Sequence, residues 1–142
     1  MNVNEIMTKS VVTLKSGDTV ERAATLMKEH NVGSIPVCEG SSVKGIITDR
    51  DITLKSVASG KDSKSQTVNE IMTTNIVTGT PNMSLDEASK VMSENQIRRL
   101  TIVDNNNLVG IVALGDLAIE NKSNEMAGCA LSSISQGTKS EW

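Results

Sequence analysis

The hexapeptide Val-Asn-Glu-Ile-Met-Thr occurs twice in this chain of 142 residues, at positions 3–8 and 68–73. The same offset of 65 residues relates Gly45-Ile46 to Gly110-Ile111 and Asp51 to Asp116. A fixed period of this length indicates two copies of one structural unit. Because each copy is near the lower size limit for independent stability, we expect the two copies to bury their apolar faces on each other.

The composition excludes several classes of function. The chain has no Phe or Tyr and a single Trp, so it lacks the aromatic platforms on which single-stranded bases stack. The net charge of −3 argues against a basic face for nucleic acid. The sequence shows no signal-peptide pattern and no apolar run of about 20 residues. We expect a cytoplasmic globular protein that binds neither nucleic acid nor membranes.

Hydrophobic periodicity predicts the same order of elements in both repeats, strand–helix–strand–strand–helix. In repeat 1 we expect a strand at 11–14, a helix capped by Asp18 that buries Val20, Ala23, Ala24 and Met27, a hairpin of 34–38 with 43–48, and a helix at 49–54. In repeat 2 we expect a strand at 76–78, a helix with a Ser84/Glu87 capping box that buries Leu85, Ala88 and Met92, a hairpin of 100–103 with 108–113, and a helix from Asp116.

These elements predict a division of the chain into repeat 1 at 1–54, a polar linker at 55–67, repeat 2 at 68–120, and a C-terminal helix and tail at 121–142. The Gly- and Ser-rich composition around residues 56–65 indicates the linker. The C-terminal helix is predicted from an amphipathic spacing of Met126, Ala127, Ala130, Leu131 and Ile134.

Several motifs recur in register in the two repeats. They are the two Ile-Met-Thr starts, SIPV at 34–37, GIITDRD at 45–51, RRLTIV at 98–103 and GIVALGD at 110–116. Together these motifs resemble a tandem pair of cystathionine-β-synthase-type (CBS) domains, a Bateman module, over about residues 1–120. The resemblance implies an α/β fold of two β-α-β-β-α repeats packed with pseudo-two-fold symmetry. It also implies clefts between the repeats that bind adenosine-type ligands, and pairing of two chains into a homodimer.

Asp51 and Asp116 each follow a strand in the first turn of a predicted helix. A carboxylate placed there can accept hydrogen bonds from both hydroxyls of a ribose. The alternative is that Thr48 and Asp51 form a capping box that serves only the helix start. Ala113 replaces the Thr in repeat 2 while the acid stays, which favours the ribose role; both roles are compatible.

The resemblance assigns contacts with ribose or phosphate to Thr48, and Arg50 is a further candidate. Repeat 2 has Ala113 and Gly115 at these two positions, so we expect the two clefts to differ. By the same resemblance, Arg98 and Arg99 reach the ligand's phosphates, which a planar guanidinium suits. Repeat 1 has Gly33-Ser34 there, and the alternative is a solvated arginine pair beside Glu94.

The resemblance also places an apolar slot for the base along the strands. Its expected lining residues, which are otherwise ordinary core positions, are Thr13, Ile35, Pro36, Thr78 and Leu100.

Metal and catalytic sites are not expected. Cys38, Cys129 and His30 do not have the spacing of zinc ligands, so a metal is expected only if it arrives bound to a nucleotide. Cys38 lies in an apolar run and is predicted to be a small buried hydrophobe. No set of nucleophile, base and acid can be assembled from the sequence, so an enzyme is not expected.

We therefore expect a regulatory module that senses AMP, ADP or ATP, or else S-adenosylmethionine or NAD, and transmits its occupancy to an unknown protein effector. The alternative is a scaffold with empty clefts whose role is dimerisation.

Overall fold

The computed structural model describes residues 1–119, so the expected C-terminal helix and Cys129 lie outside the described part of the chain. The chain divides into two compact units. One contains residues 12–76, and the other combines residues 1–11 with the chain from residue 77 onward. We call them the repeat-1 unit and the repeat-2 unit, because each contains the central helix and the hairpin of that repeat.

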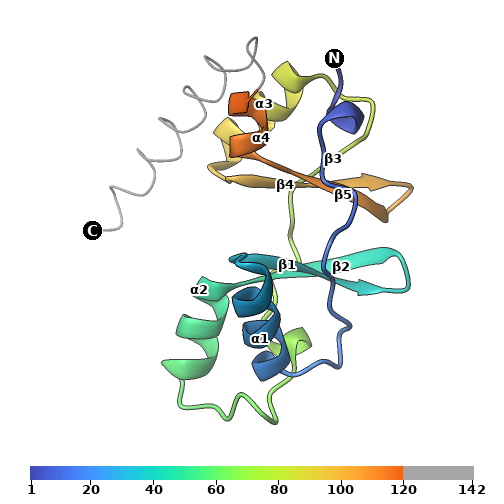
Figure 1. Cartoon of the computed structure of the whole chain (residues 1–142). Helices are drawn as coiled ribbons and strands as arrows, with labels where there is room; N and C mark the ends of the chain where they lie inside the picture. The colour runs from blue at the N-terminus through green and yellow to red at the C-terminus, as the bar shows by residue number, and fades with distance from the viewer. Residues whose placement is uncertain (120–142) are drawn as a thin grey trace. The chain divides into compact units, whose positions relative to one another are not determined.

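The repeat-1 unit is a β-hairpin with its helices on one face (Figure 1). β1 (Ser34–Glu39) and β2 (Ser42–Thr48) pair antiparallel, as the sequence predicts. α1 (Val20–His30) packs with α2 (Asp49–Ile52), which continues into the π-helical turn η2 (Thr53–Val57). The core contains aliphatic and methionine side chains, namely Leu14, Val20, Ala23, Leu26, Met27, Ile35, Val37, Ile47, Val68 and Ile71.

The repeat-2 unit has the same design with one more short strand (Figure 1). β4 (Arg99–Asp104) lies between β3 (Thr78–Gly79), to which it is parallel, and β5 (Asn107–Ala113), to which it is antiparallel. α3 (Leu85–Asn95) and α4 (Leu114–Ile119) cover one face of this sheet. The buried core consists of Val3, Met7, Leu85, Ala88, Met92, Leu100, Ile102, Val112 and Leu117.

Residues with positive φ end the central helices and close the second hairpin. Asn31 (φ 52°) and Gln96 (φ 54°), which are equivalent in the two repeats, terminate α1 and α3. Asn105 (φ 52°) and Asn106 (φ 67°) form the turn between β4 and β5. Two consecutive left-handed residues suit a two-residue hairpin, and Asn tolerates that conformation better than most side chains. The predicted turn is confirmed.

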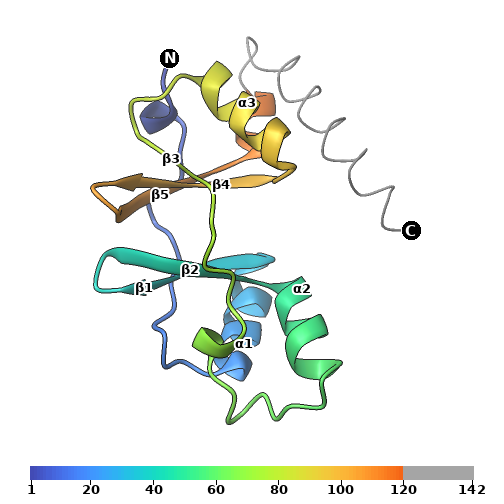
Figure 2. The same ribbon diagram turned by 180° about the vertical axis from the view of Figure 1, so that it is seen from behind.

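Each copy of the repeated hexapeptide packs in the unit of the other repeat. Thr8 exchanges two backbone hydrogen bonds with Ile111 (2.9 and 3.0 Å), and Thr73 exchanges two with Ile46 (2.9 and 2.8 Å). The turn η3 (Val68–Glu70), which opens the second copy, lies beside α1 (Figure 2). Each compact unit thus combines segments of both repeats. The boundaries predicted from the sequence, 1–54 and 68–120, do not describe this exchange of segments.

The first strand of each repeat is shorter than predicted. In the stretch 11–14, Leu14 alone makes a ladder contact, a parallel bridge to Val37. Its N–H donates to the Pro36 carbonyl (3.0 Å), and its own carbonyl accepts from the Cys38 N–H (2.7 Å). In the stretch 76–78, Thr78 alone belongs to a strand.

The start of α1 also differs from the prediction. Thr19, not Asp18, is the N-cap, and its hydroxyl accepts from the Arg22 N–H at 3.1 Å. The Asp18 carboxylate instead accepts from the Lys15 N–H at 2.8 Å in the preceding turn. The buried stripe contains Leu26, three residues after Ala23, while Ala24 is exposed. In α3, Ser84 is the N-cap as predicted, and Leu85, Ala88 and Met92 are buried.

The predicted linker is partly structured. The helix that begins at Asp49 continues through Val57. Farther along, the Ser63 and Gln66 carbonyls each accept at 2.9 Å, from the N–H groups of Glu21 and Val20. These two donors belong to the first turn of α1, where no partner is available within the helix. The segment therefore closes the start of α1.

Candidate functional site

The motif at 45–51 forms the junction of β2 with α2. Thr48 is the N-cap: its hydroxyl accepts from the Asp51 N–H, and its N–H donates to Asp51 Oδ2, both at 3.0 Å. The capping box that the sequence offered as an alternative is therefore present. Asp51 is buried, with 8% of its surface exposed, and its second oxygen, Oδ1, lies 3.1 Å from Lys55 Nζ.

The equivalent junction of β5 with α4 keeps half of this arrangement. The Ala113 N–H donates to Asp116 Oδ2 at 2.8 Å, although Ala113 has no hydroxyl to return a bond. The loss of the threonine therefore does not free the acid from the helix start, and this weakens the inference drawn from the sequence. Asp116 is half-buried, and within residues 1–119 no ion pair to Asp116 is present.

The two arginines lie at this same junction. Arg99 pairs with Ala113 across the β4–β5 ladder, and the Arg98 carbonyl accepts from the Leu114 N–H at 2.8 Å. Both side chains are exposed, and neither forms an ion pair within the described part of the chain. Glu94, the alternative partner, is paired with Lys90 at 3.9 Å. The structure thus places Arg98, Arg99 and Asp116 at the same end of the β4–β5 hairpin.

The same contact exists without the arginines in the repeat-1 unit. The Gly33 carbonyl accepts from the Asp49 N–H at 2.9 Å, which is the counterpart of the bond between Arg98 and Leu114. Arg50 is exposed in the first turn of α2. The backbone framework of the two junctions is therefore alike, and the side chains differ.

The residues expected to line the base differ in accessibility. Ile35 and Leu100 are fully buried in the cores of their units, and Pro36 is buried beside Leu14. Thr13 and Thr78 are exposed. The threonines offer polar groups to a ligand, whereas Ile35 and Leu100 act first as core residues.

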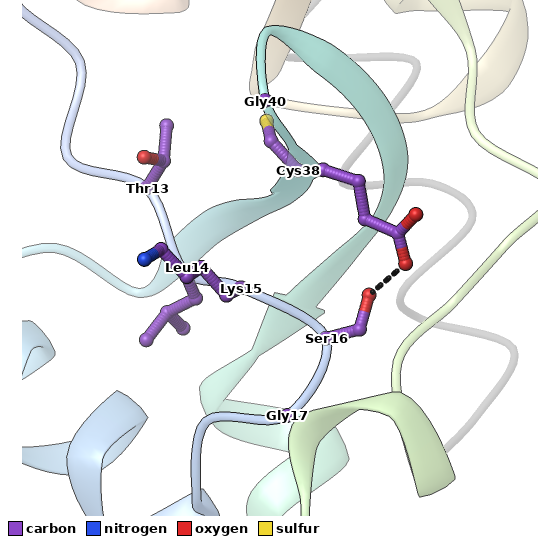
Figure 3. Close-up of a pocket in the computed structure, with 8 residues that line it drawn as sticks. Thr13, Leu14, Lys15, Ser16, Gly17, Cys38 and Gly40 are labelled. Atoms are coloured by element: carbon purple, nitrogen blue, oxygen red, sulfur yellow. Dashed lines mark hydrogen bonds between the residues drawn. The ribbon is translucent and has the colours of Figure 1, made fainter.

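A pocket of about 330 Å³ opens in the repeat-1 unit between the turn at 15–17 and the end of β1 (Figure 3). Of the predicted site residues it contains Thr13, and its apolar floor includes Leu14 and Cys38. The Ser16 hydroxyl donates to Glu39 Oε1 at 3.1 Å across one wall. Cys38 is buried, as the sequence predicts, and this burial raises the pKa of its thiol.

Lys55 is the residue near the site that the sequence interpretation missed, because it fell in the predicted linker. Its ammonium bridges Asp51 and the carbonyl of Ile71, to which it donates at 3.2 Å. The spacing of Asp51 and Lys55, four residues apart on a helix, is the signal that predicts such a pair.

Residues 1–119 contain no group of three or more His, Cys, Asp or Glu side chains placed to hold a metal ion. None of the helices in this range has the length and apolar character needed to cross a bilayer.

Comparisons with known proteins agree on one family. The model of the CBS domain matches residues 3–57 and 68–121. The chain is 55% identical over 134 residues to the CBS domain-containing protein YhcV of Bacillus subtilis, covering 94% of this chain and 95% of the relative. It resembles the crystal structure of Hypoxic Response Protein I with two coordinated zinc ions, at 34% identity and a TM-score of 0.78, covering 84% of this chain and 98% of that one.

A further solved structure bears on ligands. It is a CBS domain pair in complex with 5′-methylthioadenosine and S-adenosyl-L-methionine, with 30% identity and a TM-score of 0.74. The match covers 84% of this chain and 94% of that one.

Proposed function

This chain belongs to the CBS domain family, and from that premise we propose that it senses an adenosine-type nucleotide. A pair of CBS domains is a regulatory module. The observation that carries the proposal is the junction in the repeat-2 unit, where Asp116 is anchored by the Ala113 N–H beside Arg98 and Arg99. A related CBS pair bound to 5′-methylthioadenosine and S-adenosyl-L-methionine supports a ligand of this class.

The groups at this junction suit the parts of a nucleotide. Asp116 Oδ2 is held by the backbone, and Oδ1 remains to accept from a ribose hydroxyl. The two exposed arginines suit phosphate oxygens, so we propose AMP, ADP or ATP as the ligand rather than S-adenosylmethionine, which has no phosphate group. Thr78 and Leu100 would border the base.

The equivalent candidate residues in repeat 1 carry less positive charge than those in repeat 2. Thr48, Arg50 and Asp51 would meet ribose and phosphate there, with Thr13, Ile35 and Pro36 near the base. No arginine pair precedes β1, since Gly33 and Ser34 stand at those positions. We propose that any ligand in repeat 1 binds more weakly than the ligand in repeat 2.

Regulation would follow from linkage. A nucleotide that binds one arrangement of the protein more tightly than another shifts the population toward the first. We propose that a homodimer carries this shift to a protein effector. The sequence leads us to expect that the protein has no metal of its own and that it is cytoplasmic. Both expectations remain predictions.

The proposal is tested by calorimetric titration with AMP, ADP, ATP, S-adenosylmethionine and NAD. Asp116→Asn should weaken binding about tenfold or more, because a hydrogen bond to a charged acceptor is lost. Asp104→Asn is the matched control, since it removes the same charge from the exposed end of β4. Equal affinity in wild type and Asp116→Asn would show that the site is wrongly assigned.

The competing function is a scaffold that dimerises without ligand. It is favoured by the engagement of both Asp51 oxygens with the protein itself. A thermal-shift screen in which no nucleotide raises the melting temperature, together with a stable dimer in light scattering, would establish it.

A further inference from the structure

We infer that Lys55 closes the Asp51 carboxylate to nucleotide, so that the ligand response of this protein comes from Asp116. This inference rests on the proposed function and adds the residue that decides which of the two repeats responds.

The Asp51 carboxylate is largely buried, and both of its oxygens are engaged by the protein. Oδ2 accepts from the Thr48 N–H at 3.0 Å, and Oδ1 lies 3.1 Å from Lys55 Nζ. The carboxylate side chain is 10% exposed, and the lysine side chain covering it is 49% exposed. Each oxygen of Asp51 therefore has a partner from the protein before a ligand arrives.

Lys55 is also held from a second side. Its ammonium donates to the Ile71 carbonyl at 3.2 Å, and Ile71 is a buried residue of the second hexapeptide copy. The ammonium therefore links η2 to this segment as well as to Asp51. A ligand that displaced it would break two contacts rather than one.

A ribose is a poor competitor for this position. A hydrogen bond to an ionised carboxylate is strong whether the donor is an ammonium or a hydroxyl, but only the ammonium also brings a compensating positive charge. The ribose hydroxyls are neutral, so they cannot replace the charge that Lys55 supplies to a carboxylate with little access to water. The ion pair between Lys55 and Asp51 thus disfavours binding of a ribose to Asp51.

The counterpart position in repeat 2 has the opposite charge. The offset of 65 residues that relates Asp51 to Asp116 relates Lys55 to Glu120. A glutamate carboxylate accepts hydrogen bonds and cannot donate to Asp116 or to the carbonyl of Ile6, the counterpart of Ile71. The lysine that pairs with Asp51 therefore has no basic counterpart at the equivalent position of repeat 2.

The test is the stoichiometry of AMP binding, measured by calorimetry on the full chain. Wild type should bind a single AMP per chain, and Lys55→Met should bind two, because methionine keeps the apolar stem and removes the ammonium. Lys44→Met, an exposed position in β2, is the matched control and should bind as wild type does. The double variant Lys55→Met/Asp51→Asn should lose the second AMP.

Lys55→Gln provides a second route if Lys55→Met lowers the melting temperature, since its amide keeps a polar N–H donor but carries no charge. Two AMP molecules bound by wild type, or a single AMP bound by both folded Lys55 variants, would overturn the inference while leaving nucleotide sensing intact. If neither wild type nor the Lys55 variants respond to any nucleotide, the proposed function fails and this inference fails with it.

Discussion

Gly110 lies so close to Met7 that a Cβ added to the glycine would come within 2.6 Å of the methionine Sδ. The same Cβ would lie 2.9 Å from the Thr8 carbonyl oxygen, which belongs to the backbone and cannot rotate away. Gly45 has the same relation to the second hexapeptide copy, at 2.9 Å from Met72 Sδ and 2.8 Å from the Thr73 oxygen. The glycine that opens each Gly-Ile motif therefore allows the hexapeptide to pair with the neighbouring strand.

Gly110→Ala should lower the free energy of unfolding by about 1–3 kcal/mol, since one methyl group forces the hexapeptide away from β5. Urea denaturation followed by circular dichroism measures this change. Gly17→Ala is the control: nothing lies within 4 Å of its added Cβ, and its stability should stay close to wild type. Equal stability of the two variants would show that the close approach is not a constraint.

Thr48→Ala should cost about 1 kcal/mol of stability, because the Asp51 N–H loses the hydroxyl that caps it. Thr48→Ser should retain most of the stability, since a serine hydroxyl can accept the same bond. Both variants are compared with wild type by thermal unfolding. A serine variant as unstable as the alanine variant would indicate that the threonine methyl group, not the cap, is responsible.

Thr19→Ala should also cost about 1 kcal/mol, because it removes the hydroxyl that accepts from the Arg22 N–H. Asp18→Asn should cost less, since the Asp18 carboxylate bonds to the turn at Lys15 and an amide oxygen can still accept there. Denaturation midpoints of the two variants test the assignment of the cap. If Asp18→Asn were the less stable of the two variants, Asp18 and not Thr19 would be the N-cap of α1.

Cys38 should react slowly with Ellman's reagent in the folded protein and rapidly in urea, in a Cys129→Ser background. The thiol is 4% exposed, and burial raises its pKa. In the unfolded chain the thiol ionises above about pH 8.5 while the folded thiol stays protonated, so the unfolded state binds fewer protons. The free energy of unfolding should therefore fall as pH rises above about 8.5.

Cys38→Ala should remove this part of the pH dependence. An equally steep loss of stability in the Cys38→Ala variant would assign the effect to other groups.

Periodicity within each repeat was sufficient to predict both hairpins and both central helices. Apolar spacing determines which face of α3 is buried, and the two asparagines determine the turn at 105–106. The sequence could not predict that each hexapeptide packs in the unit of the other repeat. Val3 and Val68 are apolar, and either unit could bury such a side chain. Partners that are distant in the sequence leave no local signal.

The site was predictable to a similar degree. Asp51 and Asp116 are both at helix starts, as their position after a strand indicates. The role of Lys55 was missed because a polar stretch rich in Gly and Ser concealed the continuation of the helix through Val57. The cap at Thr19 was misplaced by one residue, since Asp18 and Thr19 are both good capping residues.

The most direct test of the account compares AMP with its 2′,3′-dideoxy analogue by calorimetry, in wild type and in Asp116→Asn. If Asp116 accepts from the ribose hydroxyls, wild type should bind AMP about tenfold more tightly than the analogue, and the variant should show almost no preference. A preference for AMP that is equally large in both proteins would contradict the assignment of Asp116 as the ribose acceptor.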